Sequence, residues 1–348
     1  MSERIYYWDN FKGVLIFLVV FAHLLFLPSL HAFRDAIYMF HIPAFVFISG
    51  YFGKSTHSHC SESILKLLSA YIIFNSLFSI IYNAYSFLYT SSVYWYVFAL
   101  IVWRLSAPCL AKYKSCLLIL TALSILIGYY HEINGVFNLA RIISFSPFYM
   151  AGYLLSCETA QERMIQKSPR VILTGVGSIV LAFLIGFFSY NVIGFSGEEL
   201  CMYPYRSWEF GGIGRVCLML TSAFSIYALG CIIPNKKVPL LSRFGKYSLS
   251  IYLFHGFLPL FYKYVYISHE YSFLFFAFGV SMATCIIFSL PFVVQLTDKV
   301  FSAGAKVLLG NYETNYYTIV VRTLFWGIAV IFLFHEPILR IVYFFYNL

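Results

Sequence analysis

The chain has 348 residues, of which 61% are hydrophobic and only 11% carry a formal charge, and its net charge is +9. A soluble domain has about a quarter charged residues, so this composition and a mean hydropathy of +0.80 exclude an ordinary soluble enzyme and predict a chain whose main solvent is lipid. The eight cysteines form no C-x-x-C pair, which argues against both a disulfide scaffold and a metal site.

Apolar runs long enough to cross a membrane, which takes about 20 residues, follow one another along most of the sequence. The chain contains no soluble domain and no repeat of fixed period, so we expect an all-α, polytopic integral membrane bundle forming one domain over residues 1–348. The second run contains HIPAF, whose histidine and proline predict a broken helix. We predict ten spans and an eleventh near the C-terminus, at 12–30, 36–52, 64–89, 93–110, 115–130, 139–156, 171–194, 213–233, 247–267, 272–297 and 318–334.

The distribution of basic residues predicts that the N-terminus is cytoplasmic, because positive residues concentrate on that side of a membrane. With alternating spans, four basic residues fall on the outer side, at Arg34, Arg206, Lys263 and Arg340. The cytoplasmic side holds 16, at Arg4, Lys12, Lys54, Lys66, Lys112, Lys114, Arg163, Lys167, Arg170, Lys236, Lys237, Arg243, Lys246, Lys299, Lys306 and Arg322. This bias explains most of the positive charge, so no nucleic-acid partner is needed.

Three further arginines, Arg104, Arg141 and Arg215, lie within or at the edges of predicted spans. An arginine at depth costs several kcal/mol unless it is paired or reaches water. Each one alone is explained by a side chain that extends to the membrane surface. Together with histidines at depth, the three favour a polar cavity between helices.

The first span, FKGVLIFLVVFAHLLF at residues 11–26, contains Lys12 and His23. Their spacing corresponds to three helical turns plus about 20° and a rise of about 16 Å, so they share one face, with Lys12 at the cytoplasmic boundary and His23 near mid-membrane. Asp9 lies one turn before Lys12 and close enough to pair with it. The ordinary alternative is that Asp9 and Lys12 are interface anchors and that His23 is a buried, hydrogen-bonded core residue.

Two later spans also contain a histidine, His41 in FHIPAFVFISGYF and His255 in GKYSLSIYLFHGF, where Ser248 and Tyr252 precede it. An imidazole in a positioned, dry site is an efficient general base near neutral pH. A cluster of histidine, arginine and lysine without a carboxylate inside a span suits an anionic or phosphate-bearing ligand better than a cation.

The segments WDNFKGVLIFLVVFAH, FHIPAFVFISGYF and GKYSLSIYLFHG resemble the membrane-integral acyltransferases of family three, and are most similar to its fucose 4-O-acetylase-like subgroup. In that family the first helix carries a basic residue, usually arginine, followed by a histidine at this spacing. Here the basic residue is Lys12, which cannot make the bidentate contact of a guanidinium. Asp9 matches the acidic position before it, Phe40–Tyr51 matches the phenylalanine-rich motif, and the resemblance covers essentially the whole chain.

The resemblance implies acyl transfer from cytoplasmic acyl-CoA, with acetyl-CoA as the expected donor and no metal, to a sugar hydroxyl of a surface polysaccharide or lipid-linked glycan precursor at a bacterial inner membrane. His23 would be the general base, with direct transfer and an acyl-histidine intermediate both open. Asp9 would orient Lys12, and His41 would assist at the acceptor or stabilise the oxyanion. Donor binding would involve Lys12, Arg104, Ser248 and His255, and acceptor binding Arg141 and Arg215.

Two other classes of function fit parts of the pattern. A transporter or flippase of an anionic or glycolipid substrate would also use a cavity lined by histidine and arginine. A purely structural partner in a polysaccharide-export complex is the third alternative. The stripe of Asp9, Lys12 and His23 favours the enzyme, since a structural protein gains nothing from costly polar residues at depth.

Overall fold

The computed structural model describes residues 6–54, 60–81, 93–130, 138–155, 168–188, 205, 210–258, 270–310 and 318–326. Within these ranges the chain contains helices and no strand, which confirms the all-α prediction. The principal helices are α1 (Tyr6–Leu24), α2 (His31–Tyr38), α3 (His41–Gly53), α4 (Cys60–Ile81), α5 (Trp95–Leu110), α6 (Cys116–Leu126), α7 (Leu139–Leu154), α9 (Pro169–Phe188), α11 (Gly211–Ile232), α12 (Pro239–Lys246), α13 (Ser248–His255), α15 (Glu270–Phe288) and α16 (Pro291–Leu308).

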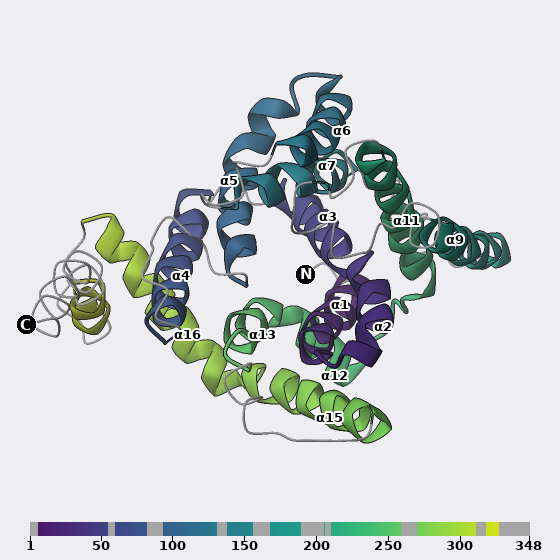
Figure 1. Ribbon diagram of the computed structural model, residues 1–348. Helices are drawn as coiled ribbons and strands as arrows, with labels where there is room; N and C mark the ends of the chain where they lie inside the picture. The colour runs from purple at the N-terminus through teal and green to yellow at the C-terminus, as the bar shows by residue number, and fades with distance from the viewer. Residues whose placement is uncertain are drawn as a thin grey trace, which may run out of the picture.

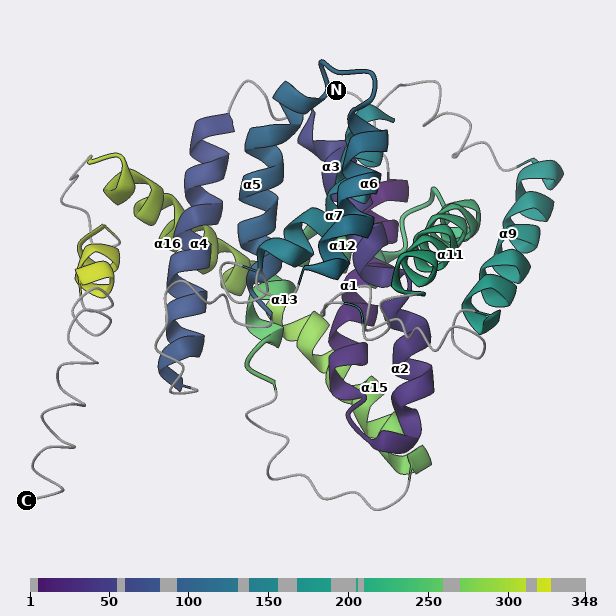
Figure 2. The ribbon, with the colours of Figure 1, turned by 45° about the horizontal axis from the view of Figure 1, so that its top comes forward.

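Helix α1 lies near the middle of the bundle, beside α3, α12 and α13 (Figure 1). Helices α9 and α11 lie on one side of it and α4 and α16 on the other, and the turned view in Figure 2 keeps this order. Among the helices long enough to span, α1 is the most enclosed, with 72% of its apolar window buried, whereas α9 has 17% buried. The helix that carries Lys12 and His23 is therefore internal, and α9 is peripheral.

Five of the described helices are long and apolar enough to cross a membrane, or six if a bent pair counts as one span. One of the five is the stretch 33–53, which the structure interrupts between Tyr38 and His41, as the HIPAF segment predicts. The bent pair is α15 and α16, which meet at 61°, so the predicted span 272–297 crosses a break in the helix. The described part of the span predicted at 318–334 is helical over 318–326, and the rest lies outside the described residues.

The first helix begins earlier than predicted, at Tyr6 rather than at residue 12, and ends at Leu24 rather than at residue 30. Its polar start is buried because the amide of Asn10 donates hydrogen bonds to the carbonyls of Pro234 (2.8 Å) and Lys236 (2.9 Å). A buried amide satisfied in this way costs little. Residues that look like a membrane boundary in the sequence therefore belong to the packed helix.

Two glycines allow α1 and α12 to touch backbone to backbone. A Cβ atom on Gly13 would lie 2.1 Å from the carbonyl oxygen of Leu241, and one on Gly245 would lie 1.7 Å from that of Asp9. Small residues of this kind let membrane helices approach closely. The contact fixes α12, and with it the start of α13, against the first third of α1.

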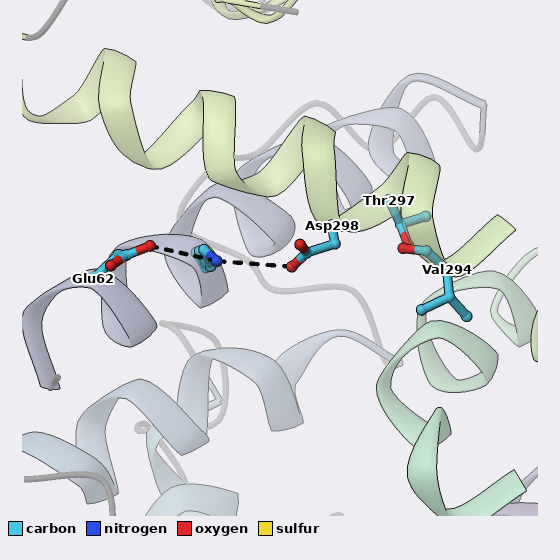
Figure 3. Close-up of polar contacts among 5 residues, drawn as sticks. Glu62, Val294, Thr297 and Asp298 are labelled. Atoms are coloured by element: carbon cyan, nitrogen blue, oxygen red, sulfur yellow. Dashed lines mark hydrogen bonds and ion pairs between the residues drawn. The ribbon is translucent and has the colours of Figure 1, made fainter. Parts of the chain in front are cut away.

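Helix α16 is joined to α4 by one ion pair, in which the ammonium of Lys66 lies 3.8 Å from Asp298 (Figure 3). The same ammonium lies 3.4 Å from Glu62, one turn earlier in α4. The two carboxylate side chains are 64% and 69% exposed. Exposed pairs contribute only about 0.2–1 kcal/mol each. The network therefore orients α16 rather than holding the bundle together.

Candidate functional site

The structure brings the three predicted histidines together from three helices, α1, α3 and α13. The rings of His23 and His255 lie 5.3 Å apart, centroid to centroid. His41 is close enough to both for electrostatic interaction. His41 and His255 are fully buried, whereas His23 is half-buried. His23 is therefore the member of the cluster whose side chain is partly exposed.

His23 lies one residue before the end of α1, whereas the predicted span continued to residue 30. The chain turns back directly after it into η1 (Pro28–Leu30) and α2. As a result, α2 lies against the end of α1 that bears His23. The site is formed where this helical hairpin meets α3 and α13.

Tyr38, at the end of α2, joins two of the histidines. Its hydroxyl lies 3.2 Å from Nδ1 of His23, and its ring centroid lies 5.0 Å from that of His41. Tyr38 was not among the residues predicted from the sequence. In the sequence, only its position three residues before His41 pointed to a shared site. That spacing predicts little here, because the helix is broken between the two residues.

The two buried histidines are held by backbone carbonyls. His41 donates from Nδ1 to the carbonyl of Ile37 at 2.7 Å, and His255 donates from Nδ1 to the carbonyl of Tyr252. A carbonyl only accepts, so Nδ1 carries the hydrogen and Nε2 of each neutral ring is an acceptor. Both Nε2 atoms are buried without a hydrogen-bond partner among the described residues.

This tautomer bears differently on the two roles predicted for His41. A neutral ring whose only N–H faces Ile37 has no donor left for an oxyanion, which requires N–H or O–H groups. Its Nε2 lone pair suits a substrate hydroxyl instead. The geometry therefore favours the acceptor-side role of His41 over oxyanion stabilisation.

Helix α13 is anchored to α5 by two tyrosines. Tyr94 donates to the carbonyl of Leu253 at 2.8 Å, and Tyr252 donates to the carbonyl of Val93. Both tyrosines are buried. The hydroxyl of Ser250 also donates to the carbonyl of Phe288 in α15 at 2.8 Å. Because α13 has only eight residues, these three bonds help to hold His255 beside His23.

Arg141 of α7 belongs to the surroundings of the cluster. Its guanidinium lies over the ring of Trp95, 5.6 Å from the centroid. Arg141 and Arg34 are both close enough for their charges to act on the imidazole of His23. The site is therefore rich in positive charge, which agrees with the prediction of an anionic or phosphate-bearing ligand.

The other end of α1 carries the predicted ion pair. Nζ of Lys12 lies 3.5 Å from a carboxylate oxygen of Asp9 and 4.9 Å from the ring centroid of Phe52. The side chain of Lys12 is 23% exposed and that of Asp9 10%. The structure therefore contains the predicted contact between Asp9 and a partly exposed Lys12, and the role of Asp9 in orienting Lys12 stays a prediction.

Ser248 and His255 are the first and last residues of α13. Gly245 packs on Asp9, and His255 packs on His23, so the chain between them follows α1 from one candidate region to the other. Ser248, which is half-buried, lies along this path. Its position agrees with contact to an elongated donor, a role that stays a prediction.

Two predicted arginines are engaged in contacts between helices. Arg104 of α5 donates to the hydroxyl of Ser63 in α4 at 2.7 Å. Arg215 is buried in α11, and its Nε lies 3.4 Å from the hydroxyl of Tyr205, which donates to the carbonyl of Ile125 in α6. These contacts explain both arginines structurally, so their roles in binding donor and acceptor stay predictions.

Among the described ranges, no group of three histidine, cysteine, aspartate or glutamate side chains is placed to hold a metal ion.

Comparison with known proteins identifies the family. A family model described as an acyltransferase domain, of acyltransferase family 3, matches residues 5–290. No curated protein and no solved structure matches the chain. The match includes α1, α3 and α13, which supply the three histidines. The chain therefore belongs to this acyltransferase family, and with its apolar helices it is a multi-pass membrane protein.

Proposed function

We propose that this member of the acyltransferase family moves an acyl group, expected to be acetyl, from cytoplasmic acyl-CoA to a sugar hydroxyl. The acceptor is a surface polysaccharide or its lipid-linked precursor, and the location is the inner membrane of a bacterium. The observation that carries the proposal is the half-buried His23, bonded through Nδ1 to Tyr38 and flanked by His255.

The spacing along α1 supports a donor that enters from the Lys12 end. Eleven residues of helix separate Lys12 from His23, a rise of about 16 Å. Acyl-CoA carries phosphates at one end and its thioester at the end of a long arm. If Lys12 binds the phosphates, an arm that spans this rise brings the thioester to His23. Helix α13 follows α1 along the same path.

The proposed reaction is a direct transfer with His23 as general base. Nε2 of His23 takes the proton of the acceptor hydroxyl while the hydroxyl oxygen attacks the thioester carbon. The carbon–sulfur bond then breaks, and the CoA thiolate leaves with the proton from the imidazolium. The products are the O-acyl sugar and free CoA.

This role requires that Nε2 of His23 be unprotonated, so that Nδ1 carries the hydrogen. Nδ1–H then donates to the hydroxyl oxygen of Tyr38 across the observed 3.2 Å. In the opposite tautomer Nε2 would carry the hydrogen and act as a donor, so no base would face the substrate. A phenolic hydroxyl can accept as well as donate, so Tyr38 is proposed as the residue that accepts from Nδ1–H in the tautomer that the reaction needs.

The test uses the purified full chain in lipid nanodiscs with radiolabelled acetyl-CoA and candidate glycans. We expect labelled glycan, and loss of label by a factor of about 100 or more with His23→Ala. His31→Ala is the matched control, since His31 is an exposed histidine at the start of α2 and its loss should leave transfer unchanged.

Full transfer by a folded His23→Ala protein would contradict the proposed base. Repeating the assay with longer acyl-CoA donors identifies the acyl group. Movement of the glycan across a vesicle membrane with no acylation of it would favour the transporter alternative instead.

A further inference from the structure

A cavity of about 600 Å³ lies between α2 and the pair α9–α11. Figures 1 and 2 show α9 and α11 on the same side of α2. The volume falls within the range of pockets that hold one small ligand. Met39, Phe40, Ala182, Phe183 and Gly186 are among the side chains that form its walls.

The walls require a hydrocarbon occupant. Asp35 is the single charged residue among the described lining residues. The hydroxyl of Thr221, which also faces the cavity, already donates to the carbonyl of Cys217 at 2.9 Å. The cavity thus offers very few polar groups, and a polar ligand inside it would lose its hydrogen bonds to water.

The position of α9 determines where such an occupant comes from. This helix is long and apolar enough to span, and most of its surface is exposed. In a membrane that surface faces lipid. A chain can therefore enter the cavity from the bilayer, between α9 and α2.

Helix α2 separates this cavity from the histidine cluster. Asp35 and Met39 line the cavity, whereas Tyr38, on another face of the same helix, contacts His23. Arg34 is offset from Asp35 by about 100° around the helix, and its charge acts on His23. A cation thus lies on the face of α2 that bears Tyr38, across the helix from the apolar cavity, and a helix is only about 10 Å wide.

We propose that the cavity holds the hydrocarbon chain of a single-chain lipid phosphate that carries the acceptor sugar. This inference rests on the proposed function and specifies its acceptor as lipid-linked. The chain lies between α2, α9 and α11, the phosphate lies on the Arg34 side of α2, and the sugar reaches His23.

The experiment measures binding of radiolabelled polyisoprenyl phosphate to the purified full chain in phosphatidylethanolamine nanodiscs. Gly186→Leu fills the cavity, because a Cβ at this position would lie 3.1 Å from Sδ of Met39. Gly177→Leu is the matched control on the same helix, since no atom lies within 4 Å of a Cβ there. Ala182→Phe is a second filling variant, in case the first fails to fold.

We expect both filling variants to bind the probe about tenfold more weakly, because several buried methylene contacts are lost, and Gly177→Leu to bind as the wild type does. Equal binding by all four proteins would overturn the proposal. Displacement of the probe by phosphatidylglycerol at equal concentration would also overturn it, since the cavity would then hold bulk lipid. The assay needs no acyl transfer, so failure of the proposed reaction would be seen separately.

Discussion

The hydroxyl of Tyr38 lies 3.2 Å from Nδ1 of His23, although the two residues belong to successive helices that run in opposite directions. Only one tautomer of His23 combines this contact with a basic Nε2. The pair therefore links the short turn after α1 to the protonation state of the proposed base.

Tyr38→Phe keeps the ring and removes the hydroxyl, so it tests this link directly. We expect kcat to fall about tenfold with little change in either KM, the effect of losing one hydrogen bond of ~1.4 kcal/mol. Steady-state kinetics with acetyl-CoA measures both constants. Tyr113→Phe, at an exposed tyrosine between α5 and α6, should leave them unchanged, and an unaltered kcat in Tyr38→Phe would remove Tyr38 from the mechanism.

Lys12→Gln should raise KM for acyl-CoA about tenfold while kcat stays within a factor of about two, because a charged contact to phosphate is lost in both ground and transition states. Lys12→Arg should bind the donor as well as the wild type or better, since a guanidinium contacts phosphate bidentately. Lys114→Gln, at an exposed lysine, is the control. A donor KM that does not respond to Lys12→Gln would place the CoA phosphates elsewhere.

The two ring nitrogens of His41 can be tested separately. The amide of asparagine occupies the position of Nδ1 and preserves the bond to the Ile37 carbonyl, whereas the amide of glutamine reaches the position of Nε2. If His41 contacts the acceptor through Nε2, His41→Gln should retain more transfer than His41→Asn, and His41→Asn should melt closer to the wild type. The reverse order of activity would make His41 a structural residue at the break between α2 and α3.

Gly245→Ala should destabilise the protein by about 1–3 kcal/mol, because its Cβ would lie 1.7 Å from the backbone oxygen of Asp9, an atom that cannot rotate away. Thermal unfolding in detergent measures the loss. Gly279→Ala, in α15 with open space around it, should instead be neutral or stabilise by up to about 1 kcal/mol. Equal melting temperatures for the two variants would mean that α1 and α12 do not pack as described.

The fold class and the neighbourhood of the three histidines follow from the sequence, because apolar runs and helical periodicity are local properties. The limits of α1 do not follow from it. Asp9 and Asn10 look like boundary residues, and only the bonds from Asn10 to the distant carbonyls of Pro234 and Lys236 reveal that they are buried. A hydropathy profile cannot detect a hydrogen-bond partner that lies more than 220 residues away in the sequence.

Tyr38 and the cavity beside α2 escaped prediction for a related reason. The contact of Tyr38 with His23 depends on how tightly the chain turns after Leu24, and the cavity depends on the separation of α2 from α9 and α11. Both are properties of packing between helices. The bond from Arg104 to Ser63 of α4 is likewise a packing contact that the sequence did not predict. Extension to the membrane surface and donor binding both stay predictions for Arg104.

The 61° bend between α15 and α16 makes bilayer thickness relevant to this protein. The arm from Ser272 to Phe288 is about 25 Å long at 1.5 Å per residue, which is less than the ~30 Å of a typical hydrocarbon core. The second arm leaves at an angle and carries Asp298, Lys299 and Lys306. Lipid beside this wall must therefore thin to meet it, at a cost of fractions of a kcal/mol per Å, so vesicles of shorter-chain lipid are the better match for the bundle.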